Sequence, residues 1–365
     1  MVRGALAAGC TFFAGYPITP ASPILMMMMR ELPKVGGVAI QGEDEIASIG
    51  MCIGAAMSGA RAMTATSGPG ISLCSENIGL AIMGEVPLVI VDVQRMGPAT
   101  GGATTTAQGD IQFARWGTAG GYPIIALAPS SVTECYSLTI RAFALAERFR
   151  VPVFLLTDKE LNMTATTVDA AAYGDGSGNE VPVNAPPGRE GGQEFTPYRY
   201  DPLDGVPPLV PYGDGDIVRF TGSTHDEAAF ITKDTETINR LNRHLAEKIE
   251  AHRDEIELVE ADLEDGAHTL FVSFGITAGA MREAVQAVRR EGRKVSALTI
   301  NSLWPVPETA IRNALNGVER VVVAELNLGQ YRREIERLGP GREIVGLNRV
   351  DGELIAPEQF LELLA

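Results

Sequence analysis

The stretch AMTATSGPGISLCSENIGLAIMGEVPLVIVDV, residues 62–93, decides the fold. It begins and ends with short apolar runs, at residues 62–66 and 88–93, and the small and apolar residues at 73–83 are typical of a helix. Two strands joined by a crossover of this length run parallel in one sheet. The same alternation continues from residue 4 to about residue 158. We therefore predict an α/β fold with a parallel sheet covered by helices on both faces.

The chain has 365 residues, which suggests two domains with connecting material. Near residue 162 the sequence becomes rich in Gly, Pro, Asp and Asn, which indicates a long extended excursion over a surface or a partner. Residues 235–259 have the periodicity of an amphipathic helix, and a second α/β unit with strands near 269–274, 295–300 and 321–324 follows. We predict a first domain at 1–163, the excursion and helix at 164–262, and a smaller α/β domain at 263–365.

The charge and cysteine content exclude several classes of protein. A formal net charge of −16 argues against a nucleic-acid partner, which requires a basic surface. The cysteines Cys10, Cys52, Cys74 and Cys135 lie far apart, which argues against a zinc or iron–sulfur site in this chain and favours the reducing cytoplasm. The N-terminus does not resemble a secretory signal, and no apolar run approaches the roughly 18 residues of a membrane span.

The segment GYPITPAS at residues 15–22 follows a predicted strand and precedes an apolar helix. The Thr19 hydroxyl and the free backbone N–H groups would therefore lie at a helix N-terminus, which attracts anionic or carbonyl oxygen. The alternative is that this segment is an ordinary helix start, with a Thr or Ser N-cap and Pro in the first turn.

The segment QGEDEIASIG at residues 41–50 places Glu43, Asp44 and Glu45 just before a helix that contains Gly50 and Gly54. Attraction to the helix dipole explains Glu43 and Asp44. Glu45 lies closest to the apolar helix, where its carboxylate would be removed from water, as an acid–base group requires. The alternative is that Glu45 is a third solvated carboxylate attracted to the helix dipole. The small residues would let a flat ring or another backbone approach closely.

A Gly-rich turn at residues 67–70 follows the strand at 62–66, so Ser67 and Gly68 lie where open α/β sheets bind ligands. Arg95 follows the strand at 88–93 in the equivalent position. Its guanidinium would suit a carboxylate, although a lone Arg is more often a surface ion-pair residue. The turn alone also fits a simple strand-to-helix reversal.

Together these segments resemble the alpha subunits of 2-oxoacid:ferredoxin oxidoreductases, most closely the 2-oxoglutarate branch. The resemblance covers nearly the whole chain. It rests on YPITP (16–20), EDEIASI (43–49), TATSGPG (64–70), SEN (75–77), VDVQR (91–95), QGD (108–110), ARWGT (114–118), THDE (224–227), LWPVPE (303–308), ELNLGQ (325–330) and GLNRV (346–350).

The resemblance implies a thiamine-pyrimidine-type domain followed by a transketolase C-terminal-like α/β domain. It aligns Glu45 with the glutamate that protonates the aminopyrimidine of thiamine diphosphate. It places Thr19, Ser67 and Gly68 with Glu45 at the cofactor, and Thr19 and Arg95 at the substrate. The implied reaction is oxidative decarboxylation of 2-oxoglutarate to succinyl-CoA and CO2, with coenzyme A as co-substrate and electrons passed to ferredoxin.

The resemblance also implies a beta subunit that carries the Mg2+-diphosphate motif and a 4Fe–4S cluster, in a dimer of heterodimers that shares the thiamine diphosphate. This motif is Gly-Asp-Gly followed downstream by Asn. The sequence GDG at 174–176 has no suitably placed Asn, and the one at 213–215, which precedes Asn242, follows the proline-rich VPPLVP. We read the latter as an exposed turn.

Three alternatives remain open at the level of sequence: a branched-chain 2-oxoacid or pyruvate enzyme of the same family, a non-catalytic scaffold subunit, and a self-sufficient thiamine decarboxylase. The family commonly carries Pro and a basic residue beyond the arginine strand, but residues 100–108 read TGGATTTAQ. Substrate identity is therefore less constrained than the reaction class. The segment FGIT at 274–277 also departs from the family's form, and we assign it no catalytic task.

Overall fold

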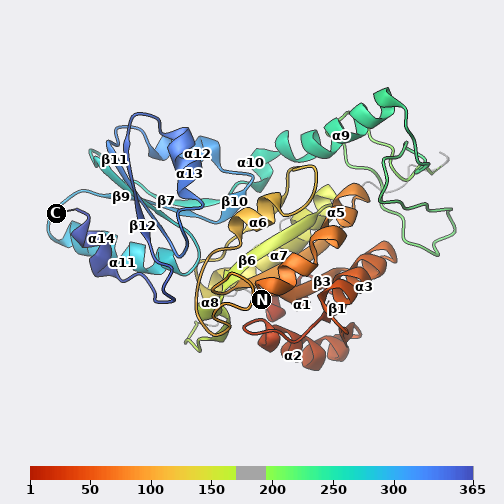
Figure 1. Ribbon diagram of the computed structural model, residues 1–365, viewed down its shortest axis with the longest axis horizontal. Coiled ribbons are helices and arrows are strands. Elements are labelled where there is room, and N and C mark those ends of the chain that lie inside the picture. The colour runs from red at the N-terminus through yellow and green to blue at the C-terminus, as the bar shows by residue number, and fades with distance from the viewer. Residues whose placement is uncertain (170–194, 365) are drawn as a thin grey trace.

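The computed structural model describes residues 1–169 and 195–364. Two α/β units lie side by side, and helix α9 (Thr235–Glu250) runs along one edge of the molecule between them and the segment that follows residue 195 (Figure 1). No helix in the described ranges is long and apolar enough to cross a membrane.

The first sheet has seven strands in the order β10-β5-β6-β4-β3-β1-β2. Its strands are β1 (Phe12–Gly15), β2 (Val38–Gln41), β3 (Ala62–Thr66), β4 (Leu88–Gln94), β5 (Ile125–Leu127), β6 (Pro152–Asp158) and β10 (Ser302–Trp304). All pair in parallel except β10, which comes from the second unit and pairs antiparallel with β5. Every residue of β3, β4 and β6 is buried, because helices cover both faces of the sheet. The predicted covered parallel sheet is confirmed.

Two apolar clusters lie on opposite faces of this sheet, and the alternation of side chains along β4 sends Ile90 into one and Val91 into the other. One face is covered by α3 (Glu45–Met57), α4 (Pro69–Leu73), α5 (Ser75–Met83) and α6 (Ile111–Trp116). The other is covered by α1 (Val2–Ala7), α2 (Ser22–Glu31) and α7 (Val132–Phe149), while the short elements η1 (Leu32–Val35) and α8 (Lys159–Met163) follow α2 and β6.

The second sheet has the order β12-β11-β8-β9-β7. Its strands are β7 (Val259–Asp262), β8 (Thr269–Ser273), β9 (Ser296–Ile300), β11 (Arg320–Glu325) and β12 (Glu343–Asn348), and its helices are α11 (Thr277–Arg290), α12 (Glu308–Ala314), α13 (Arg332–Leu338) and α14 (Pro357–Glu362). The two units share part of their core, since Trp304 Nε1 donates to the Ile111 carbonyl at 2.9 Å.

One prediction for this region was wrong. Residues 235–259 do not form a single helix: α9 ends at Glu250, α10 (Arg253–Ile256) follows, and residues 259–262 become the antiparallel edge strand β7. The helical periodicity of the sequence continues past Glu250, because a segment of a few residues can match the helical period and the strand period equally well. Pairing with β9 makes residues 259–262 a strand.

Residues 195–234 of the excursion contain neither helix nor named strand, and hydrogen bonds to their backbone anchor them to the first unit. Arg150 is buried and donates to the carbonyls of Pro197, Pro207 and Pro208, while the Tyr212 amide donates to the Met57 carbonyl at 2.9 Å. These hydrogen bonds pair backbone carbonyls that have no partner in a helix or strand, so the segment is held against the first unit without regular secondary structure.

Candidate active site

The candidate residues lie at one edge of the first sheet. Strands β4, β3, β1 and β2 are neighbours and run parallel, so their carboxyl ends meet at the same edge. The loops that leave these ends carry Thr19 after β1, Glu45 after β2, Ser67 after β3 and Arg95 after β4. This is the edge at which open α/β sheets bind ligands.

Arg95 connects two of these loops. Only 5% of its surface is exposed, and Nη1 donates to the backbone carbonyl of Thr19 at 2.6 Å. A Cβ at position 68 would lie 3.4 Å from Arg95 Nε, so the Gly68 turn lies directly against the guanidinium. Arg95 is therefore a buried residue of the sheet edge, and not the surface ion-pair residue that a lone Arg suggests.

Thr19 does not cap the helix that follows it. Helix α2 begins at Ser22, its N-cap is Ala21, and no side chain caps it. The ordinary N-cap interpretation of the GYPITPAS segment is therefore wrong, and the Thr19 hydroxyl is not used by α2.

The three acidic residues before α3 have three different environments. Glu43 is exposed, whereas Asp44 is the N-cap and accepts from the Ala47 amide at 2.7 Å. Glu45, the first residue of the helix, is only 6% exposed. A Cβ at Gly70 would lie 2.5 Å from Glu45 Oε1 and would also meet the Thr66 hydroxyl. The turn after β3 and the acid after β2 thus face one another.

The residues of this edge fit the pyrimidine end of a thiamine diphosphate. The Thr66 and Ser67 hydroxyls and Arg95 Nε are buried and have no hydrogen-bond partner among the described residues, so they are available to a ligand. Beside Glu45, Gly50 and Gly54 of α3 are exposed, and a Cβ on either would meet nothing within 4 Å. This leaves an open surface on which a flat ring or another chain can lie.

The described residues include no metal-binding cluster for the other end of the cofactor. Within residues 1–169 and 195–364, no group of three or more His, Cys, Asp or Glu side chains could hold a metal ion. Residues 213–215 form an exposed turn, as predicted, and the GDG sequence at 174–176 lies outside the described residues.

Sequence reasoning missed Asp92 and Asp110 as part of this edge. Asp92 is buried in β4, and burial together with the neighbouring Asp110 raises the pKa of Asp92 well above its ordinary value. Burial also raises the pKa of Asp110 to about 6. The signal was present, because a charged residue inside the apolar run LVIVDV is unusual unless it is paired.

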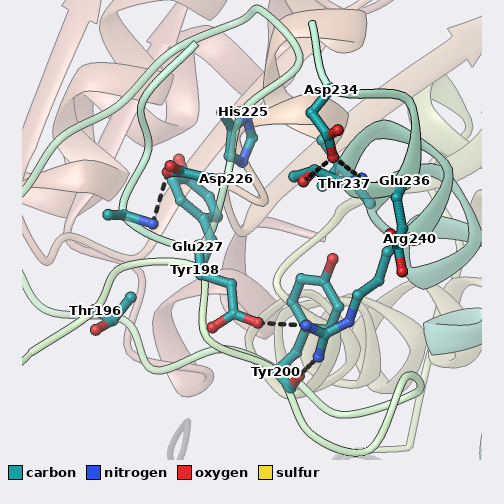
Figure 2. Close-up of a pocket in the computed structure, with 12 residues that line it drawn as sticks. Thr196, Tyr198, Tyr200, His225, Asp226, Glu227, Asp234, Glu236, Thr237 and Arg240 are labelled. Carbon is teal, nitrogen blue, oxygen red and sulfur yellow. Dashed lines mark hydrogen bonds and ion pairs between the residues drawn. The ribbon is translucent and has the colours of Figure 1, made fainter. Parts of the chain in front are cut away.

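A separate pocket of about 450 Å³ lies between α9 and the excursion (Figure 2). Arg240 in its wall pairs with Glu227 at 2.8 Å and donates to the Tyr200 carbonyl at 3.0 Å. The Asp226 carboxylate accepts from the amides of Ala228 and Phe230. The charged residues Asp226 and Glu227 of the THDE segment therefore hold the excursion together.

A covered parallel sheet with a buried acid opening a helix at its carboxyl edge is the architecture of a thiamine diphosphate-binding domain. Residues 3–241 match the family model described as pyruvate flavodoxin/ferredoxin oxidoreductase, thiamine diphosphate-binding, and residues 267–360 match core domain II of pyruvate:ferredoxin oxidoreductase. The chain belongs to this family, as a 2-oxoacid:ferredoxin oxidoreductase alpha subunit, and the resemblance read from the sequence is confirmed.

Similar proteins include the 2-oxoglutarate synthase subunit KorA of Methanothermobacter thermautotrophicus, which is 43% identical over 99% of this chain and 95% of that protein. KorA of Methanocaldococcus jannaschii is 42% identical over 98% of this chain and 95% of its own length. The ketoisovalerate oxidoreductase subunit VorB of Methanothermobacter thermautotrophicus is 36% identical over 99% of this chain and 94% of its own length.

Among solved structures, the 2-oxoglutarate:ferredoxin oxidoreductase of Magnetococcus marinus, with 2-oxoglutarate, coenzyme A and succinyl-CoA bound, superposes with a TM-score of 0.91 at 31% identity. The match covers all of this chain and 63% of that one, so this chain spans less than two thirds of the length of that protein. A split-gene transketolase, at 11% identity and a TM-score of 0.52, shares the fold alone, which agrees with the predicted transketolase-like architecture.

Proposed function

We propose that this chain is the alpha subunit of a 2-oxoglutarate:ferredoxin oxidoreductase, in which Glu45 is the acid that serves the aminopyrimidine of thiamine diphosphate. The observation that carries the proposal is the position of Glu45, which is buried against Gly70 beside the open face of α3. A carboxyl group removed from water, next to unpaired hydroxyls, is suited to holding a proton at a ring nitrogen.

Thiamine diphosphate, when bound, supplies the carbon nucleophile that allows a 2-oxoacid to lose CO2. This chain's own residues bind and orient the reactants. Arg95, which is fixed by its bond to the Thr19 carbonyl, neutralises the substrate carboxylate, and the Thr19 hydroxyl binds a substrate or cofactor oxygen. Ser67 and Gly68 complete the wall on the cofactor side, where a glycine allows close approach.

The other half of the active site comes from a beta subunit. This subunit would supply Mg2+, the diphosphate site and a 4Fe–4S cluster, since the described parts of this chain contain no metal-holding group. The exposed glycines of α3 provide the surface for contact, and we propose a dimer of heterodimers that passes electrons to ferredoxin and the acyl group to coenzyme A. Four free, buried cysteines support a reducing, cytoplasmic location.

We further propose that residues 1–163 form the pyrimidine-type domain, 164–262 the excursion with its connecting helix, and 263–365 the C-terminal α/β domain. Strand β7, at residues 259–262, pairs with β9 of the second sheet although it precedes residue 263. The sheet of the C-terminal domain therefore includes the four residues that come directly before the proposed boundary.

The substrate assignment is supported by the relatives. Four 2-oxoglutarate synthase KorA subunits are 40–43% identical to this chain and a fifth KorA, of a 2-oxoglutarate oxidoreductase, is 34% identical, whereas the two ketoisovalerate subunits are 34–36% identical. The test is coenzyme A-dependent reduction of a viologen dye by the assembled complex with each 2-oxoacid in turn. We expect the highest kcat/KM with 2-oxoglutarate, and equal or better turnover of 2-oxoisovalerate or pyruvate would contradict the assignment.

Replacement of Glu45 tests the catalytic role. Loss of a general acid typically costs about 10²–10⁴-fold, so Glu45→Gln should lower kcat by at least about 100-fold with the complex intact. Glu43→Gln, two residues away and exposed, is the matched control and should keep full activity. Full activity of Glu45→Gln would instead support a scaffold subunit, and decarboxylation by this chain alone with Mg2+ would support a self-sufficient enzyme.

A further inference from the structure

Two aspartates beside the active-site edge, the buried Asp92 and the partly buried Asp110, have no role in the proposed reaction. Asp92 pairs in register with Thr66 of β3, and Asp110 directly precedes α6, where its amide donates to Gln94 Oε1 at 3.1 Å. Both carboxyl oxygens of Asp92 and Oδ2 of Asp110 are buried without a hydrogen-bond donor among the described residues. Two ionised carboxylates in such a place would repel each other, so the missing donor is a proton on one of them.

The surroundings decide which aspartate holds the proton. Burial, and then the charge of Asp110, raise the pKa of Asp92 well above its ordinary value. Burial raises the pKa of Asp110 to about 6, while the bond from Asp92 and the charge of Arg95 favour its ionised form. These influences favour Asp92 as the protonated member of the pair and Asp110 as the charged one.

The pair lies between two loops of the active site. The side chains of Asp92 and Gln94 lie on the same face of β4, and the Asp110 amide donates to Gln94 Oε1 on that face. The Gly68 amide favours the ionised form of Asp92, and the Arg95 guanidinium favours the ionised form of Asp110. Arg95 in turn bonds the Thr19 carbonyl. The Cys74 thiol, between α4 and α5, is the other titratable group that interacts with Asp92, and the charges of Glu45 and Asp44 at the start of α3 act on the same thiol. Burial raises the pKa of Cys74 to about 12, so this thiol keeps its proton throughout the working range.

We propose that Asp92 and Asp110 form a one-proton carboxyl pair that positions Arg95 and the Gly68 turn for the carboxylate of the 2-oxoacid. The Asp92 O–H donates to the Asp110 carboxylate, and the remaining negative charge fixes the orientation of the Arg95 guanidinium. Both are positioning residues, because they act through Arg95 and Gly68. The inference rests on the proposed function and extends it to two residues outside the predicted site.

The test compares two replacements in the assembled complex. Asp110→Asn removes the charge that faces Arg95, so we expect the KM for 2-oxoglutarate to rise at least tenfold with kcat changed less than threefold. Asp92→Asn is the conservative variant, because its amide N–H donates to Asp110 as the acid O–H does. The increase in KM for Asp92→Asn should be at most one fifth of the increase for Asp110→Asn. Equal effects, or a larger effect of Asp92→Asn, would overturn the proposal.

The pH profile separates positioning from a merely structural role. In the unmodified complex, KM should rise as the pH falls through about 6, because Asp110 takes up a proton and loses its charge. Asp110→Asn should show a high KM at every pH without this step, whereas Asp92→Asn should keep the step. An identical step in Asp110→Asn and the unmodified complex would show that the titrating group lies elsewhere.

Thermal unfolding provides a readout that does not depend on turnover. The folded pKa of Asp110 lies above its ordinary value of 3.8, so its contribution to stability is greatest below that value and is lost as the pH rises through about 6. The Tm of Asp110→Asn relative to the unmodified complex should therefore increase from about pH 5 to about pH 7. A constant or falling difference would overturn the shared proton. An unmodified complex that turns over no 2-oxoacid would instead reject the proposed function itself, and with it the substrate role of the pair.

Discussion

Gly70 lies against the carboxylate of Glu45 so closely that a Cβ at position 70 would come within 2.5 Å of Oε1. The same Cβ would meet the Thr66 hydroxyl. The turn after β3 can therefore close over the acid only if residue 70 has no side chain. The Gly-rich turn is thus explained by contact with a catalytic candidate as well as by the reversal of the chain.

Gly70→Ala should displace Glu45 and Thr66 while leaving the fold in place. A misplacement of about 1 Å can cost on the order of 100-fold in rate, so we expect kcat to fall by about that factor. The measurement is dye reduction by the assembled complex, with circular dichroism as the check on folding. Gly279→Ala on α11 is the control, since position 279 is exposed and a Cβ there meets nothing within 4 Å. Unchanged kcat in Gly70→Ala would mean that Glu45 is not held as the structure indicates.

Gly54 should mark the contact with the beta subunit. It is exposed on α3, and a Cβ there meets nothing in this chain, so Gly54→Leu should not lower this chain's own Tm. Removal of a helical glycine even favours the helix by up to about 1 kcal/mol. If a partner packs on this face, the same change should abolish co-purification of the beta subunit. Normal assembly with Gly54→Leu would place the partner on another surface.

The sequence predicted the elements that form locally. The strand predicted at residues 62–66 is observed at the same residues, because a Gly-rich turn ends its apolar run. The strands β7 and β10 were not predicted. They are only three or four residues long, and pairing with distant strands creates them.

The candidate site shows the same difference between local features, which the sequence predicts, and contacts between distant residues, which it does not. Each candidate could be read from its own segment, since strand ends and helix starts are local features. The bond from Arg95 to the Thr19 carbonyl and the meeting of Asp92 with Asp110 depend on strand order, which local patterns do not encode. The sequence therefore predicted which residues matter at each loop but not which of them touch.

Gln108 should couple the two α/β units. Its Nε2 donates to the Phe274 carbonyl at 3.1 Å, and its Oε1 accepts from the Leu326 amide at 3.1 Å and the Thr277 hydroxyl at 3.2 Å. Gln108→Met keeps the volume but leaves these buried groups unpaired, at about 1–3 kcal/mol for each unsatisfied group. We expect the free energy of unfolding to fall by about 3 kcal/mol.

Calorimetry provides the measurement, and uncoupling should appear as two separate unfolding transitions in place of one. The control is Gln286→Met on α11, where the side chain is exposed. A single transition at an unchanged Tm for Gln108→Met would show that other contacts carry the coupling.

Glu85 should anchor α9 to the first unit. It is completely buried and accepts from Lys248 Nζ at 2.5 Å and from His244 Nε2 at 3.0 Å. Glu85→Gln leaves the Lys248 ammonium buried without a counter-charge, which typically costs about 3–5 kcal/mol. The double variant Glu85→Gln with Lys248→Met removes both charges and should recover most of that loss. Urea unfolding of the full chain measures both, and equal losses in the two variants would contradict the ion pair.

The pH dependence of the Glu85→Gln variant provides an independent check of the same anchor. Burial alone would raise the pKa of Glu85, but Lys248, His244 and Arg150 outweigh it and hold the pKa well below the ordinary value of 4.5. Such a group stabilises the fold above its unfolded pKa, and this contribution is lost as the pH falls. The stability gap between the unmodified chain and Glu85→Gln should therefore stay constant above about pH 5 and narrow below about pH 4.5. If the stability difference between the unmodified chain and Glu85→Gln is the same at acidic and neutral pH, Glu85 is protonated and its partners are uncharged over the whole pH range.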